Sequence, residues 1–363
     1  MHLHVSDKVG TCMPLQKSNS LWLLYALSML ACCLHLDAHN EPLKVTNAPP
    51  EKLLGYNPNT DHIVPAPNER AIALICAHGF GDRKHRFGFE NTQNTTIVAF
   101  HFRDSRDRQH SWGDINLGQE ADARVVLYHI ILCYEAGYKT IALFGHSRGA
   151  AACITALDMV ERPDAYRATW EAFGFVAHTV TTTQKSTRHL INRPAIKEIR
   201  EALQRGTIFL ARPLMSVDAA IGCSVANTLP CALSFLYPPA HWAATKAFAC
   251  CTSYNAARAE PIDLLESLIG GNTHYKFTIY LATDDGEVSN KCDARLFDLA
   301  IQFPENLILH QIATATLVNA YQQSPGPKPA RLEALFIKNP AKAAHIFIPD
   351  AISAAQEYLA GIH

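Results

Sequence analysis

Short, nearly continuous apolar runs alternate along this chain with longer segments in which apolar residues recur at helical spacing. Residues 71–77 and 140–144 form two such runs, and residues 95–102 form another between them. Further runs lie at residues 275–282 and 306–312. Strands that are buried on both faces carry apolar residues at successive positions, because helices cover both sides of the sheet. The pattern therefore predicts that these runs are strands of one parallel sheet.

The segments between these runs are predicted to be helices. One begins near Asn116, which forms a predicted capping pair with Gln119, and it ends at Gly137. Two more helices are expected at about residues 293–303 and 350–361. Strands that alternate with helices imply right-handed crossovers and ligand sites at the carboxyl ends of the strands. The predicted fold class is therefore α/β, with a mostly parallel central sheet flanked by helices.

The sequence Gly-His-Ser-Arg-Gly at residues 145–149 connects one predicted strand to a stretch of small residues with helical character. A serine in such a junction has a strained backbone and an exposed hydroxyl, and the two glycines let the strand and the helix close around it. We interpret the segment as a nucleophile elbow with Ser147 at its tip. The alternative is a surface turn in which Ser147 only caps the following helix.

Nucleophilic chemistry at a serine requires further groups. The hydroxyl attacks a carbonyl carbon when an imidazole removes its proton, and a carboxylate must hold that imidazole in the correct tautomer. Two backbone N–H groups must also face the oxygen that gains negative charge. The sequence therefore has to supply an acid, a base and a glycine-bearing turn close to the serine.

These motifs, in their order along the chain, resemble the α/β-hydrolase family over residues 65–177 and 262–363. The resemblance implies that Ser147 is the nucleophile. It also implies an oxyanion hole made by the N–H groups of Phe80, which belongs to the His-Gly-Phe turn after the first strand, and of Arg148. The histidine of that turn is expected to orient the turn rather than to carry protons.

The resemblance also favours one acid and one base among the candidates. Asp285 follows a predicted strand and has an apolar residue three positions later, as the family acid does, and Asp284 is the competitor. Both aspartates could instead simply form a turn. His345, in a loop ahead of the last predicted helix, is the expected base. Its rival, His310, lies within an apolar run and is expected to be a core histidine.

The alternation of strands and helices stops between residues 178 and 261, after a short strand candidate at residues 172–177. The first half of this interval is basic and the second half is rich in apolar and aromatic residues. Because the family places a lid at this point, the resemblance implies a mainly helical lid inserted in a hydrolase domain of residues 39–363, with apolar side chains over an acyl or lipid substrate. The alternative is a cap that packs its apolar face on the core.

The N-terminal residues 1–38 differ in character from the rest of the chain. Residues 21–34 are uncharged and follow two lysines, which resembles a secretory signal. The apolar stretch is shorter than the roughly 20 residues that span a bilayer. We therefore expect a secreted, periplasmic or cell-envelope protein, with cleavage after Ala38 or a lipid anchor at Cys32. A buried N-terminal helix is the alternative.

Charge and cysteine content limit the partners. The chain has 32 basic and 33 acidic residues, which gives no reason to expect nucleic acid as a partner. No Cys-x-x-Cys pair or His-Glu-x-x-His sequence occurs, so neither a metal nor another cofactor is expected. Of the 11 cysteines, Cys76, Cys133 and Cys153 are expected in the core, and later ones to pair if the compartment is oxidising.

The function expected from these residues is hydrolysis of carboxylic esters, of the esterase or lipase type, through an acyl-enzyme on Ser147. The partner is then a small ester or acyl substrate, with lipid or membrane-surface contact through the lid and no obligate protein partner. A thioesterase or a peptidase would use the same residues. A binding module that has kept the fold without the chemistry is the alternative from another class.

Overall fold

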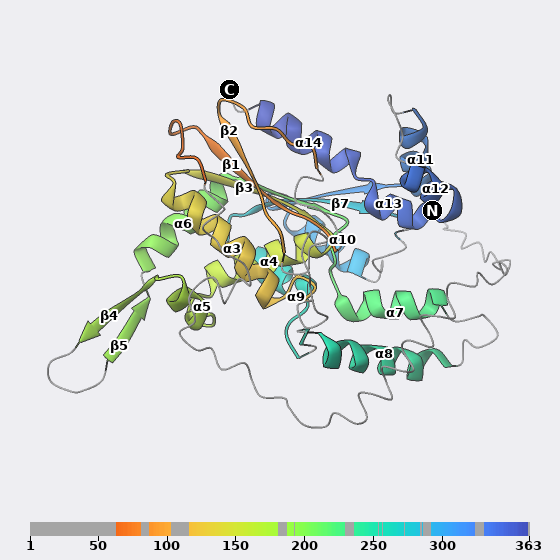
Figure 1. Ribbon diagram of the computed structural model, residues 1–363, viewed down its shortest axis with the longest axis horizontal. Coiled ribbons are helices and arrows are strands. Elements are labelled where there is room, and N and C mark those ends of the chain that lie inside the picture. The colour runs from red at the N-terminus through yellow and green to blue at the C-terminus, as the bar shows by residue number, and fades with distance from the viewer. Residues whose placement is uncertain are drawn as a thin grey trace.

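A parallel sheet organises this computed structural model, which describes residues 63–80, 87–102, 116–180, 187–191, 193–228, 236–252, 254–255, 257–271, 273–283, 285, 292–323 and 330–361. Within these residues, six strands pair in parallel in the order β2-β1-β3-β6-β7-β8 (Figure 1). They are β1 (Ile72–Ala77), β2 (Thr95–Ala99), β3 (Thr140–His146), β6 (Thr207–Ala211), β7 (Lys276–Ala282) and β8 (Leu307–Ile312). The predicted α/β class with a mostly parallel sheet is confirmed.

Helices cover both faces of this sheet. On one face α3, α4, α6, α9 and α10 contribute to the largest hydrophobic cluster, and α14 packs on the opposite face (Figure 1). The helices are α3 (Glu120–Glu135), α4 (Arg148–Glu161), α5 (Arg167–Ala172), α6 (Arg193–Arg205), α7 (Val217–Thr228), α8 (Tyr237–Cys251), α9 (Pro261–Gly270), α10 (Asp293–Gln302), α11 (Thr314–Gln323), α12 (Ala330–Lys338), α13 (Pro340–Ile346) and α14 (Pro349–Ala360).

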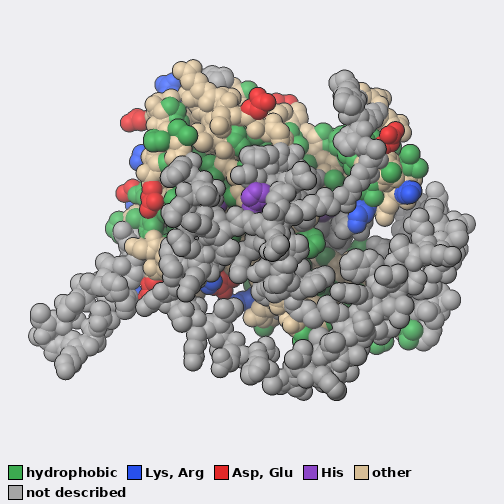
Figure 2. Space-filling view, viewed as in Figure 1, with side chains coloured by type: hydrophobic (Ala, Val, Ile, Leu, Met, Phe, Trp, Pro, Cys, Tyr) green, Lys and Arg blue, Asp and Glu red, His purple; other side chains and the backbone are tan. Residues whose placement is uncertain are grey.

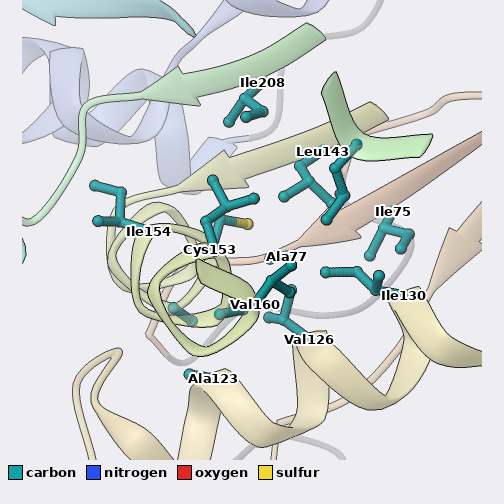
Figure 3. Packing of buried hydrophobic residues seen from close by; sticks show 14 of the residues in the cluster. Ile75, Ala77, Ala123, Val126, Ile130, Leu143, Cys153, Ile154, Val160 and Ile208 are labelled. Carbon is teal, nitrogen blue, oxygen red and sulfur yellow. The ribbon is translucent and has the colours of Figure 1, made fainter. Parts of the chain in front are cut away.

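The central strand β1 explains why its sequence is apolar at every position. Successive side chains of a strand point to opposite faces, so Ile75 and Ala77 pack with α3 and α4 while Leu74 and Cys76 pack on the side of α14. Figure 3 shows Ala77 beside Val126 and Ile75 beside Ile130, both of α3. All six residues of β1 are buried. A strand covered on both sides cannot alternate apolar and polar residues.

The interval predicted as one lid insertion contains part of the core. Strand β6 lies between β3 and β7 in the central sheet, and α6 packs against β3 within the main cluster. A Cβ on Gly206 would lie 2.0 Å from the carbonyl oxygen of Ile141, so the chain enters β6 in very close contact with β3. The apolar run of β6 is only residues 208–211, directly after a basic helix, which is why the sequence pattern concealed it. Residues 178–261 are therefore not a single inserted unit.

The strand predicted at residues 172–177 begins later than expected, at Val176. Helix α5 ends at Ala172, and Gly174, two residues later, turns the chain with a positive φ of 79°. The following strand β4 (Val176–Val180) pairs antiparallel with β5 (Thr187–Ile191) in a separate two-stranded sheet. Figure 1 shows this hairpin projecting away from the central sheet. A short apolar run does not by itself indicate which sheet it joins.

The remaining expected elements lie close to their predicted places. Helix α3 begins as expected near Asn116, whose Oδ1 accepts hydrogen bonds from the N–H groups of Ala121 and Asp122. Gln119 does not complete the predicted capping pair, because its side chain binds the backbone of Asn255. The described residues include no helix long and apolar enough to cross a bilayer. The signal-like segment at residues 1–38 lies outside the described residues.

Charged side chains of both signs are interspersed on the face of the molecule in Figure 2. The described side chains in this view show no single-sign patch, which agrees with the near balance of 32 basic and 33 acidic residues in the whole chain. The described side chains of this face therefore give no indication of a polyanionic partner.

Candidate active site

Ser147 lies in a sharp turn between β3 and α4. Its backbone has φ 53° and ψ −119°, a conformation that L-residues rarely adopt. A Cβ on Gly149 would lie 2.1 Å from the carbonyl oxygen of Ala77, and one on Gly145 would lie 2.6 Å from the Cα of Ala150. Larger residues at these two positions would collide with backbone. The glycines therefore permit the close approach of strand and helix that the strained turn needs.

The Ser147 side chain makes no capping bond with α4, unlike the serine of an ordinary helix cap. Its Oγ lies instead 2.9 Å from Nε2 of His345. On the other side of that ring, Nδ1 lies 2.8 Å from Oδ2 of Asp285. The hydroxyl can donate to Nε2 while the Nδ1–H donates to the carboxylate. The structure thus brings together the predicted serine, base and acid in one hydrogen-bonded chain.

All three residues are nearly buried, with exposed fractions of 9% for Ser147, 7% for His345 and 8% for Asp285. They come from different elements, since Asp285 follows the carboxyl end of β7 and His345 lies in the last turn of α13. Because parallel strands end at the same edge of a sheet, residues beyond β3 and β7 meet there. Low exposure strengthens each hydrogen bond of the chain.

Of the two competing candidates, only His310 can be placed. Asp284 lies outside the described residues. His310 stands on β8 at the edge of the sheet, where its ring stacks on Tyr280 with a centroid distance of 4.8 Å. It is exposed, so the expectation of a core histidine is wrong. The reason is that β8 is an edge strand, which leaves one side of an apolar run accessible to solvent.

The segment before His345 is helical rather than a long loop. Helices α11, α12 and α13 occupy most of residues 313–344, and His345 belongs to α13. Asn339 caps this helix by accepting a hydrogen bond from the N–H of Lys342, and Pro340 follows at the first helical position. His345 therefore lies in a short capped helix and not in a loop.

The two residues predicted to supply the oxyanion donors follow neighbouring strands of the sheet. In the pairing of β1 with β3, Ala77 is opposite Gly145, so Phe80 and Arg148 each stand three residues beyond a matched position. Arg148 is the first residue of α4, where backbone N–H groups have no acceptor one turn earlier. His78, fully buried, directs Nδ1 at the carbonyl oxygen of Gly79 at 2.8 Å. These positions suit a pair of N–H donors near Ser147.

The Arg148 side chain links this turn to α3. It is fully buried, and its guanidinium lies 4.4 Å from the ring centroid of Phe102 and 5.6 Å from that of Phe80. Its Nε lies 3.7 Å from Oδ2 of Asp122, which also accepts the N–H of Gly118. Sequence reasoning did not single out Asp122. The sequence feature that could have indicated Asp122 is a carboxylate at a position of the predicted helix that is surrounded by apolar residues.

One carboxyl group near the site has a perturbed pKa. Burial raises the pKa of Asp293, at the start of α10, to about 6, and the negative charge of Asp285 adds to the effect. The pKa values of the Cys76, Cys133 and Cys153 thiols are raised by burial, and these three residues lie in the core as predicted. Their thiols are therefore poor nucleophiles at neutral pH. Within the described ranges, no group of three or more His, Cys, Asp or Glu is arranged to hold a metal ion.

Comparisons with known proteins find similarity only among solved structures. No protein family model matches the chain, and no curated protein matches its sequence. The esterase Pf2001 from Pyrococcus furiosus is 11% identical, with 82% of this chain and 84% of that chain covered and a TM-score of 0.39. A lipase-esterase related protein from Clostridium acetobutylicum is 12% identical, with 82% and 96% covered and a TM-score of 0.35.

The carboxylesterase Cest-2923 from Lactobacillus plantarum is 12% identical, with 82% of this chain and 86% of that chain covered and a TM-score of 0.40. Similarity of this degree does not identify an activity. The function has to be argued from the residues of the site.

Proposed function

We propose that this protein is a serine hydrolase of the α/β-hydrolase type that cleaves carboxylic esters through an acyl-enzyme. The observation that carries the proposal is the hydrogen-bonded chain from Ser147 Oγ through His345 to Asp285, with contacts of 2.9 and 2.8 Å. The fold does not evidently need these hydrogen bonds for its stability. Each member is nearly buried, and a strained serine costs about 1–3 kcal/mol that packing alone does not require.

The chemistry follows from the geometry. His345 Nε2 takes the proton of Ser147 as Oγ bonds to the ester carbonyl carbon, and the π electrons of the carbonyl move to its oxygen. When the carbonyl reforms, the alkoxy group leaves with the proton from His345. Water then attacks the acyl-enzyme with His345 again as the base, and Ser147 regains its proton as the acid departs. Asp285 holds the ring and stabilises its charged form.

The N–H groups of Phe80 and Arg148 are proposed to stabilise the oxyanion. Each donor of this kind typically contributes roughly 3 kcal/mol to lowering the barrier. Their matched positions beyond β1 and β3 support the assignment. Arg148 also has helix α4 behind it, so the positive end of the helix dipole faces the developing charge.

Helices α7 and α8 are proposed as the lid over the substrate. Val217 of α7 packs with Ala151 of α4 one turn beyond Ser147, and Phe248 of α8 joins the same cluster. Trp242 of α8 is 64% exposed. Leu236, the residue before the first residue of α8, is 39% exposed. Large exposed apolar side chains on a helix that joins the cluster around Ala151 support an acyl or lipid substrate and contact with a lipid surface. With the apolar segment at residues 21–34, we also propose that the chain is exported.

The decisive experiment is labelling of the folded protein with a fluorophosphonate probe. The parent should be labelled, Ser147→Ala should not, and Ser353→Ala should be labelled like the parent, because Ser353 is an exposed serine of α14. A folded parent that takes no label would favour a binding module. p-Nitrophenyl esters of increasing acyl length, compared with thioester and amide substrates, would then test the ester preference.

A further inference from the structure

Two buried side chains outside the proposed triad bind the backbone that carries His345. Nε of Arg212 donates to the carbonyl oxygen of Ala344 at 3.3 Å. Nε2 of His146 donates to the carbonyl oxygen of His345 itself at 2.8 Å. The two residues are 0% and 1% exposed. The carbonyl groups of Ala344 and His345 are thus both bound by side chains from outside α13.

These bonds satisfy groups that α13 cannot satisfy alone. The last four carbonyls of a helix have no N–H partner one turn later, and the negative end of the dipole lies there. In α13, the carbonyl of Ala343 is bonded by the N–H of Phe347, and the next two carbonyls are those of Ala344 and His345. A helix of seven residues has little stability of its own. The position of its last turn therefore depends on the donors that bind it.

Arg212 is itself fixed on three sides. Its two terminal nitrogens each lie 3.0 Å from an oxygen of Asp350, in the first turn of α14. Its backbone N–H donates to the carbonyl oxygen of Tyr280 at 2.8 Å, and its φ of 46° is in the left-handed region. Asp350 is favoured by the positive end of the α14 dipole. The arginine therefore connects the carboxyl end of β6 to β7, α13 and α14.

The pairing calls for an arginine in particular. One planar group has to reach a carboxylate with two parallel N–H bonds and a carbonyl with a third, which a lysine ammonium cannot do in a fixed geometry. Burying such a pair costs more desolvation than an apolar pair of similar volume, so packing alone does not require it. This desolvation cost is understandable if the arginine has a positioning role, because the carbonyl that it binds belongs to Ala344, the residue before His345.

We propose that Arg212, held by Asp350, is a positioning residue that sets the His345 ring at hydrogen-bond distance from Ser147. The inference rests on the proposed function. Without the arginine fork, the last turn of α13 would keep only the bond from His146 and would shift. A displacement of about 1 Å at a reacting group reduces the rate roughly 100-fold, without weakening substrate binding to the same degree.

The test replaces Arg212 by lysine, which keeps the charge and loses the fork. We expect kcat for an ester substrate to fall about 10- to 100-fold while KM stays within about twofold. The matched control is Arg162→Lys, since Arg162 pairs with Asp158 at the far end of α4 from Ser147. Both variants are assayed well below their unfolding temperatures. An unchanged kcat in folded Arg212→Lys, or an equal fall in the control, would overturn the proposal.

A spectroscopic readout separates positioning from general damage. The proton between His345 Nδ1 and Asp285 should give a far-downfield NMR resonance, which we expect to move or broaden in Arg212→Lys and to stay in place in Arg162→Lys. An unmoved resonance would refute the proposal. If the parent had no activity, the proposed function would be refuted but the positioning role would not. The resonance would still show whether Arg212 determines the position of the His345 ring.

A second variant covers the case in which Arg212→Lys does not fold. The double change Arg212→Gln with Asp350→Asn removes both charges and leaves no buried ion uncompensated. It should fold, keep substrate binding within about twofold and lose at least about tenfold in kcat. If it folds with the kcat of the parent, Arg212 has no positioning role.

Discussion

Replacing Gly149 with alanine puts a methyl group where the backbone of β1 already lies. The new Cβ would stand 2.1 Å from the carbonyl oxygen of Ala77 and 2.7 Å from that of His78, whereas ordinary contact begins near 3.4 Å. Both obstacles are main-chain atoms, so no rotamer change relieves them. Helix α4 must move away from β1 by about 1 Å, and Ser147 moves with it.

Two effects of different size should follow from this shift. Overpacking of this kind costs about 1–3 kcal/mol, offset by up to about 1 kcal/mol because alanine favours the helix more than glycine does. Stability should thus fall by about 1–2 kcal/mol, which lowers the thermal midpoint by a few degrees. The catalytic loss should be larger, about 100-fold in kcat, since Ser147 moves relative to the donors beyond β1.

The assay is ester hydrolysis together with thermal unfolding, and Gly270→Ala is the matched control. Gly270 is also a helical glycine, at the end of α9, and a Cβ there meets no atom within 4 Å. That variant should keep the kcat of the parent, and its midpoint should stay the same or rise slightly, because alanine favours the helix more than glycine does. If folded Gly149→Ala keeps its kcat within twofold, the tight junction does not set the position of the nucleophile.

Three further predictions concern charged groups. Asp285→Asn should lower kcat about 10⁴-fold with little change in KM, because the His345 ring loses the acceptor that fixes its tautomer, and a smaller than tenfold loss would point to another acid. Asp293 has a folded-state pKa raised from 3.8 to about 6, so the folded state binds more protons across that window and stability declines as pH rises through it. After allowance for its partial exposure, Asp293→Asn should stabilise by about 1 kcal/mol at pH 8 and by much less at pH 4, and thermal midpoints that rise equally at both pH values would contradict this. Arg148→Gln should cost about 3–5 kcal/mol because it removes the fully buried cation that lies 3.7 Å from Asp122, and adding Asp122→Asn should recover part of that loss in denaturant unfolding.

The sequence pattern predicts the sheet well where burial is complete. The strands β1 and β3 are apolar at nearly every position because both of their faces are covered, so their composition alone marks them. Strand β6 is equally central but short, and its four apolar residues follow a basic helix with no loop of turn-forming residues between. The hydrophobic pattern places β6 in an insertion because an apolar run of four residues is too short to be recognised as a strand, although the strand is buried.

The candidate site divides in a similar way. The elbow can be recognised from the sequence because the close approach of strand and helix requires glycines at fixed spacing on either side of Ser147. His345 and Asp285 were identified through a resemblance, since nothing local to either residue determines its partner. Arg212 was not identified at all. Its importance comes from a carbonyl of α13 and a carboxylate of α14 that are more than a hundred positions away, and such pairings exist only in three dimensions.

The hydrogen bond between His345 and Ser147 joins residues 198 positions apart, and that from Asp285 to His345 spans 60. Contacts this remote form late, because the chain must first lose the entropy of closing a very long loop. During refolding from denaturant, recovery of activity should therefore trail the formation of helix and sheet. Under the proposed function, a nascent or truncated polypeptide would have no base beside Ser147 until α13 and α14 dock, and the serine would stay inactive until then.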